Sequence, residues 1–246
     1  MVSCVKPLAV IFLDMDGVMS DRMNPKESSK IDKAYQEIQA ANPIYSDRSS
    51  MSKGKAYNLL SRRAQAKCLS PDALENLSSL IERVSATMQV AIVISSAWRD
   101  EVSLDALQNH IFADCFFRDL IIDKIPDDES TYDRLKYFNK LASDFKTPSQ
   151  ICNEKYGFEL KDSRGRQIDF WLKENRAERN IYSYVVIDDN VGYSEIWKYH
   201  PDRFVNVNPS KLFSKKDADL AYDILSTEWS RGELGNECSM QTTLDS

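Results

Sequence analysis

The feature that most restricts the fold is a set of three short apolar runs, at residues 8–13, 90–94 and 184–187. Each run contains β-forming residues, and its apolar residues are continuous instead of alternating with polar ones. Strands of a parallel sheet have this pattern, because helices cover both of their faces. Two weaker runs, at 120–122 and 204–207, are further strand candidates.

Helical patterns lie between these runs. In residues 70–84 apolar side chains recur every three or four positions, and Ser70 and Pro71 are suited to the N-cap and the first helical position. Similar patterns occur at 103–111, 167–173 and 215–225. Strands that alternate with helices in this way predict an α/β fold with a doubly wound, Rossmann-like parallel sheet.

The first run ends in two carboxylates, Asp14 and Asp16, and Gly17 follows them. Ligands of open α/β sheets bind at the carboxyl ends of strands, where both acids fall. Two neighbouring carboxylates need a cation or a shared proton to offset their repulsion, and Mg²⁺ is suited to carboxylate and phosphate oxygens. A calcium-binding EF-hand has similar spacing, but its loop follows a helix and would require an acid in place of Phe12.

Polar residues also follow the second and third runs. Ser95 and Ser96 are placed to hold phosphate oxygens together with backbone N–H groups, although such serines also cap helices. Asp188 and Asp189 are adjacent acids, of which one can bind a metal directly and the other through water. An Asp-rich turn without a ligand is the alternative interpretation. Trp98 is expected to pack in the core or at the rim of the site.

Together these segments resemble the haloacid dehalogenase-like (HAD) superfamily of phosphohydrolases, in which an aspartate is the nucleophile. Asp14 and Asp16 match its first motif, Ser95 its second, and Asp188 and Asp189 its metal-binding fourth. Three segments more closely resemble the HAD subgroup first noted beside "Swiss army knife" RNA-repair enzymes. They are ISSAWR at 94–99, RQIDFWL at 166–172 and FVNV at 204–207.

The third motif of the superfamily is a Lys or Arg that stabilises the nucleophile. Arg166 is the first choice for this position, Arg164 is the alternative, and Lys161 is a third candidate. A solvated basic turn would have the same composition.

The resemblance implies a two-step reaction. Asp14 attacks phosphorus to form an aspartyl-phosphate, while Asp16 protonates the leaving oxygen and later accepts a proton from water. Mg²⁺ is expected at Asp14, the backbone carbonyl of Asp16, and Asp188 or Asp189. The residues expected to hold phosphate oxygens are Ser95, Ser96, Arg166 and Arg164.

Two insertions are expected within a single HAD-like domain at 1–229, and a polar tail at 230–246 is expected to be disordered. The first insertion, at 20–70, has the position of a cap and contains helical patterns at 31–40 and 55–66. The second lies at 123–162. The resemblance does not extend to either insertion.

The first insertion is basic, with ten Lys or Arg against five Asp or Glu, although the whole chain has a net charge of −6. Its cations, among them Arg62, Arg63 and Lys67, are expected either to steer an anionic substrate or to form a solvated surface. A phosphoprotein, including phosphotyrosine, is the favoured substrate. A phosphorylated nucleic-acid end and a small phosphorylated metabolite are the alternatives.

Two non-hydrolase interpretations are also considered. A catalytically weak HAD-fold binding protein could act on a partner through the basic insertion, but such a protein would not need both Asp14 and Asp16. A phospho-receiver domain has adjacent acids after its first strand, whereas these acids are spaced.

Composition indicates which general class of protein the chain belongs to. With 42% hydrophobic and 28% charged residues the chain is globular in composition, and the run at 8–13 is too short for a signal peptide or a membrane span. Five dispersed cysteines indicate reduced thiols in the cytoplasm. The sequence leaves open export into another cell and the oligomeric state.

Overall fold

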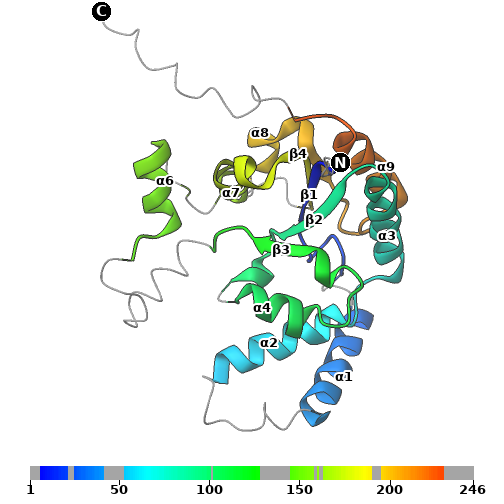
Figure 1. Ribbon diagram of the computed structural model, residues 1–246. Helices are drawn as coiled ribbons and strands as arrows, with labels where there is room; N and C mark the ends of the chain where they lie inside the picture. Colours follow the sequence, from blue (N-terminus) through cyan, green and yellow to red (C-terminus); the bar gives the residue numbers. More distant parts are fainter. Residues whose placement is uncertain are drawn as a thin grey trace, which may run out of the picture.

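The computed structural model contains one parallel sheet of five strands in the order β3-β2-β1-β4-β5 (Figure 1). It describes residues 6–21, 25–41, 53–100, 102–127, 145–157, 160, 163–189 and 195–229. The strands are β1 (Leu8–Leu13), β2 (Gln89–Ile94), β3 (Ile121–Lys124), β4 (Ile181–Asp188) and β5 (Phe204–Asn206). The prediction of a doubly wound α/β fold is confirmed. The tail at 230–246, Lys161 and much of the second insertion lie outside the described residues.

The central strand β1 is buried on both faces. Its odd-numbered residues, such as Ile11 and Leu13, pack with helices α3 (Pro71–Ser85) and α9 (Lys215–Leu225). Its even-numbered residues, such as Phe12, pack with α7 (Arg164–Arg179). This division explains the continuous apolar run, because the side chains of a strand point alternately to its two faces.

The order of the strands places a ligand site between β1 and β4. The chain moves from β1 outwards through β2 to β3, and β4 then returns to the opposite side of β1. The strand order therefore reverses at this point, and a crevice at the carboxyl ends of such strands is the usual ligand site of an open α/β sheet.

Several shorter elements complete the fold. The helix expected at 103–111 is instead a short α-helix, α4 (Leu104–Ala106), followed by a π-helical turn, η3 (Leu107–Ile111). The helix expected at 167–173 is longer, because Ser163 caps its first turn and Asn180 ends it in a left-handed conformation. The remaining short elements are η2 (Ala97–Arg99), η4 (Arg118–Leu120), α6 (Pro148–Tyr156), α8 (Ile196–Tyr199) and η5 (Pro201–Arg203).

The first insertion forms two helices, α1 (Pro25–Ala41) and α2 (Lys53–Ala66), as its helical patterns predict. They pack against each other through Ile38, Leu60 and Ala64. In Figure 1 the pair, blue and cyan, lies beyond the carboxyl ends of the strands. The insertion is therefore on the side of the sheet where the ligand site is expected.

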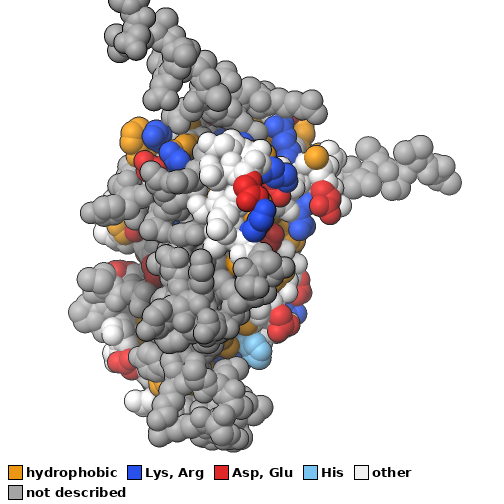
Figure 2. Space-filling view, turned by 90° about the vertical axis from the view of Figure 1, so that its left-hand side faces the viewer, with side chains coloured by type: hydrophobic (Ala, Val, Ile, Leu, Met, Phe, Trp, Pro, Cys, Tyr) orange, Lys and Arg blue, Asp and Glu red, His pale blue; other side chains and the backbone are white. Residues whose placement is uncertain are grey.

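The face that carries α6 has mixed charge. Figure 2 shows basic and acidic side chains intermingled on this face. Helix α6 contributes to the ion pairs Lys146–Glu154 and Lys155–Glu174. In the described part of this face, therefore, positive and negative charges are mixed. No helix in the described part of the chain combines the length and the apolar character that crossing a bilayer requires.

His200, which follows α8, holds the first turn of α7 against β4. Its Nε2 donates to the carbonyl of Gly165 at 2.9 Å, so the neutral ring accepts at Nδ1 from the hydroxyl of Tyr184, also at 2.9 Å. Burial lowers the pKa of His200 below the ordinary value of 6.5. The folded protein therefore keeps His200 neutral over a pH range in which the unfolded chain takes up a proton.

We expect the free energy of unfolding to decrease as the pH falls below the ordinary histidine value, by at most about 1.4 kcal/mol per pH unit from this one proton. Urea unfolding of the wild type and of His200→Gln between about pH 8 and about pH 5 tests this expectation. The variant should lose part of the pH dependence. A stability difference between the two proteins that stays constant with pH would contradict it.

Candidate active site

Asp14 follows the central strand and is held between both of its neighbours. Its backbone N–H donates to the carbonyl of Ile187 on β4 at 3.0 Å, and the N–H of Ser95 after β2 donates to the carbonyl of Leu13 at 3.0 Å. The residue is only 4% exposed. The carboxylate therefore projects from a rigid, water-poor position at the end of the sheet.

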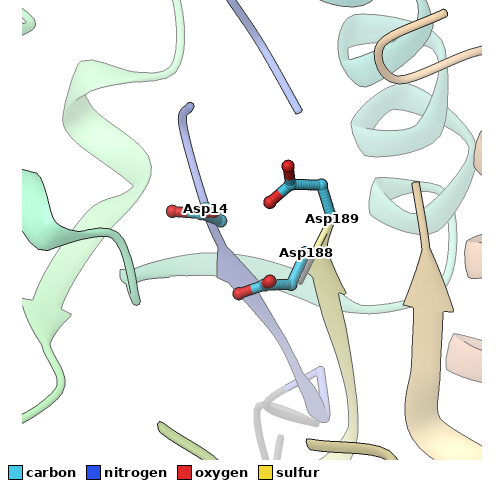
Figure 3. Close-up of side chains that lie close together, drawn as sticks. All are labelled: Asp14, Asp188 and Asp189. Carbon is cyan, nitrogen blue, oxygen red and sulfur yellow. The ribbon is translucent and has the colours of Figure 1, made fainter. Parts of the chain in front are cut away.

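Asp188 and Asp189 bring two more carboxylates to the same point (Figure 3). One oxygen of each of Asp14, Asp188 and Asp189 lies within 4.8 Å of the others. Burial raises the pKa of Asp189, and the nearby charge of Asp14 raises it further. Because crowded, buried carboxylates repel one another and oxygen ligands suit Mg²⁺, these residues fit a divalent cation.

Gly17 allows the turn after Asp14 to pass beside Asp189. Its φ of +76° lies in the left-handed region, and its N–H donates to the carbonyl of Ser20 at 2.8 Å. A Cβ atom at this position would lie 2.0 Å from Asp189 Oδ2. The turn thus requires glycine both for its backbone conformation and for the close approach of the carboxylate.

Arg164, the first residue of α7, contacts two of the three acids. Its Nη1 lies 3.3 Å from Asp14 Oδ2 and also forms an ion pair with Asp188. Burial alone would lower the pKa of the guanidinium, but the charges of Asp14 and Asp188 outweigh it and raise that pKa. Arg164 is therefore a permanent cation beside the candidate nucleophile.

Arg166, two residues further along α7, is directed to α8 instead. Its Nε donates to the hydroxyl of Tyr199 at 2.6 Å, and its guanidinium lies 5.4 Å from the centre of that ring. Of the two arginines that the sequence offers for the third motif, Arg164 is thus the one in contact with Asp14. Lys161 lies outside the described residues.

The two serines after β2 differ in their environments. Ser96 caps η2, because its Oγ accepts from the N–H of Trp98 at 3.4 Å. Ser95 is fully buried, and its Oγ has no hydrogen-bond partner among the described residues. A buried hydroxyl without a partner is costly, so the Ser95 hydroxyl suits a ligand oxygen, whereas that of Ser96 has a structural role.

Asp16 lies beside Trp98, a contact that the sequence analysis did not anticipate. The indole Nε1 of Trp98 donates to Asp16 Oδ2 at 3.1 Å, and Trp98 is only 2% exposed. Trp98 is buried, as expected, but it also touches the candidate acid/base residue. The signal in the sequence was a tryptophan three residues after the strand-end serine.

Two arginines fix the loop that follows β2. Arg99 is 1% exposed and donates to the carbonyls of Ser95 and Ser96 and to the side chain of Gln167. Arg62, from α2, donates to the carbonyls of Ala97, Trp98 and Asp100. The candidate phosphate-binding loop is therefore held from the core and from the insertion.

Three cations at the end of α2 and just after it have protein partners nearby. Arg63 and Lys67 both lie within 4.0 Å of Asp114, at 3.8 Å and 3.6 Å. With Arg62 bound to the loop after β2, these three cations contribute to the packing of α2.

Comparison with known protein families agrees with this geometry. A family model described as "HAD domain in Swiss Army Knife RNA repair proteins" matches residues 10–218 of the 246. The match begins within β1 and extends into α9, so it spans the carboxyl ends of all five strands. No curated protein and no solved structure matches the chain. The chain therefore belongs to the family of HAD domains found in Swiss Army Knife RNA repair proteins.

Proposed function

We propose that this protein is a Mg²⁺-dependent phosphomonoester hydrolase that works through an aspartyl-phosphate on Asp14. Its HAD domain indicates a hydrolase of the phosphatase type. The observation that supports the mechanism is the position of Arg164, which contacts Asp14 and Asp188 at the edge of the carboxylate cluster. A nucleophilic carboxylate that attacks an anionic phosphate needs such a cation, since two negative groups must approach each other.

The reaction has two steps. A carboxylate oxygen of Asp14 bonds to phosphorus, the bond from phosphorus to the leaving oxygen breaks, and Asp16 donates a proton to that oxygen. Water then attacks the phosphorus of the aspartyl-phosphate, Asp16 accepts a proton from the water, and inorganic phosphate leaves Asp14. Ser95 and Arg164 donate to the oxygens that do not react, where negative charge develops.

Asp14, Asp188 and Asp189 are the residues that would hold Mg²⁺, together with the backbone carbonyl of Asp16. The cation would neutralise phosphate charge and orient the phosphate for attack by Asp14. Asp188 is fully buried and Asp189 is partly exposed. This difference supports direct binding by Asp188, with Asp189 completing the site from the solvent side.

For the substrate, we propose the phosphorylated end of a nucleic-acid strand. The family description, which refers to RNA repair, favours this class over the phosphoprotein that the sequence alone favours. The alternative substrate classes, which the test must exclude, are a phosphoprotein and a small phosphorylated metabolite.

We also propose a reducing, cytoplasmic location. No disulfide links the cysteines among the described residues, Cys68, Cys115 and Cys152. Burial raises the pKa of the Cys115 and Cys152 thiols to about 11, so both are poor nucleophiles.

A substrate screen with the full chain tests the proposed function. Phosphate release is measured with Mg²⁺, and after chelation by EDTA, from 3′- and 5′-phosphorylated oligonucleotides, phosphopeptides, nucleotides and sugar phosphates. The oligonucleotides should have the highest kcat/KM, and chelation should abolish release. A preference for phosphopeptides would overturn the substrate class. Absence of release from every substrate would favour a binding protein.

Arg164 and Arg166 provide a matched pair of variants. Arg164→Met leaves Asp14 and Asp188 without their cation, so we expect kcat to fall about 10²–10³-fold. Arg166→Met removes a guanidinium directed to Tyr199 and should lower kcat by less than about 3-fold. Steady-state kinetics on one phosphomonoester, with thermal midpoints for both variants, decide between them. If kcat falls further in Arg166→Met than in Arg164→Met, Arg166 and not Arg164 is the arginine of the third motif.

A further inference from the structure

Trp98 connects Asp16 to the aromatic packing beneath the loop after β2. Its indole Nε1 donates to Asp16 Oδ2 at 3.1 Å. The indole ring of Trp98 stacks on the ring of Phe112, with centroids 5.8 Å apart and an interplanar angle of 11°. Phe112 packs in turn against Phe117. A buried ring held on a neighbouring face keeps its N–H in one direction. The orientation of the Asp16 carboxylate therefore depends on Trp98.

Arg62 joins the insertion to the same loop. Its guanidinium donates to the carbonyls of Ala97 and Asp100, each at 3.1 Å, and to that of Trp98 between them. These carbonyls belong to η2 and to Asp100, the residue that follows it. Arg62 is thus bound to the backbone of the residue whose side chain holds Asp16.

We propose that Trp98 is a positioning residue for Asp16, and that Arg62 holds Trp98 in place from helix α2. The proposal rests on the proposed function, in which Asp16 transfers a proton to the leaving oxygen. A general acid must stay within hydrogen-bond reach of that oxygen, and loss of the contact to Trp98 releases the carboxylate from this position. In the first step, where Asp16 acts as the acid, the effect is therefore specific to substrates whose leaving oxygen requires a proton.

The indole N–H resonances provide a test that does not depend on activity. The chain has four tryptophans, so a ¹H–¹⁵N spectrum contains four indole cross-peaks, which single Trp→Phe changes assign. Trp171 is a matched internal control, because its Nε1 also donates to a carboxylate, that of Asp123, at 2.8 Å. Asp16→Asn and Arg62→Gln should each shift the Trp98 cross-peak and leave that of Trp171 in place. An unmoved Trp98 cross-peak in Asp16→Asn removes the role of Trp98, and in Arg62→Gln it removes the role of the insertion.

Kinetics with two leaving groups test the consequence. Trp98→Phe keeps an aromatic ring and removes the donor. Its kcat/KM, which reports formation of the aspartyl-phosphate, should fall about 10–100-fold for β-glycerophosphate, whose alkoxide must be protonated. For para-nitrophenyl phosphate, whose phenolate leaves without a proton, kcat/KM should fall by less than about 3-fold. Trp171→Phe should change the ratio of the two kcat/KM values by less than about 2-fold.

The outcomes separate this proposal from the proposed function. Equal losses of kcat/KM on both substrates in Trp98→Phe would overturn the positioning role and leave the hydrolase intact. An inactive wild type would overturn the hydrolase, and the indole spectra would still report on the contact between Trp98 and Asp16. Should Trp98→Phe fail to fold, Arg62→Gln, in which the indole is retained, is expected to show the same selective loss.

Discussion

Replacing Asp14 with asparagine is expected to lower the turnover of every phosphomonoester by about 10⁴-fold or more. An amide at this position cannot displace an alkoxide from phosphorus, and Asp14 is the buried carboxylate at the end of β1 that contacts Arg164. The change replaces one oxygen by nitrogen, so the fold should persist. Single-turnover phosphate release at saturating Mg²⁺ measures the loss and separates it from a change in cation affinity.

Asp123→Asn is the matched control for this variant. Asp123 lies in β3, at the edge of the same sheet, and accepts from Trp171 and from the N–H of Lys124. The same chemical change there should leave kcat within about 3-fold of the wild type. Substantial turnover by Asp14→Asn would exclude the aspartyl-phosphate route. Trapping of ³²P from a labelled substrate in the wild type and its absence in the variant would support that route directly.

Replacing Gly17 with alanine should have the second largest effect. The left-handed conformation alone costs about 1 kcal/mol for a residue with a Cβ. The added Cβ would in addition lie 2.0 Å from Asp189 Oδ2, so either the turn or the carboxylate must move. We expect a loss of about 2–4 kcal/mol in the free energy of unfolding and of about 10²-fold or more in kcat/KM, because both sides of the site shift.

Gly157 allows the cost of the left-handed conformation to be separated from the cost of the clash with Asp189. It has nearly the same φ, +75°, but a Cβ there would meet nothing within 4 Å. Gly157→Ala should therefore cost only about 1 kcal/mol and leave kcat unchanged. Urea unfolding and kinetics on both variants make the comparison. If both variants lose the same free energy of unfolding and the same activity, the close approach of Asp189 to Gly17 does not contribute to the site.

The strands and the acids at their ends could be predicted because both depend on short-range patterns. Continuous apolar residues in β1, β2 and β4 indicate strands covered on both faces. Once these strands are parallel, their carboxyl ends must meet at one edge, which brings Asp14 to Asp188 and Asp189. The family match confirms the resemblance that these segments suggested.

The arginine of the third motif could not be chosen in the same way. Arg164 and Arg166 are two residues apart at the start of a helix, so their side chains point roughly 200° apart around its axis. The packing of α7 decides which of them faces the acids. Gly165 permits that packing, because a Cβ there would lie 2.9 Å from the carbonyl of Glu195.

The basic insertion shows the same limit. Counting charges in residues 20–70 indicated a surface for an anionic substrate. The tertiary structure shows that Arg62 binds three carbonyls and that Arg63 and Lys67 lie within 4.0 Å of Asp114. A count of charges along the sequence could not show that these cations also hold α2 against the rest of the protein, because their partners lie in distant segments.

The sequence by itself determined the strands, the helices that cover them and the three acids, because these follow from the alternation of side chains and from strand ends that share an edge. Only the tertiary structure decided that Arg164 contacts Asp14 and that Trp98 holds Asp16. Both contacts join residues from different elements, so their geometry depends on how the helices and loops pack and not on any local pattern.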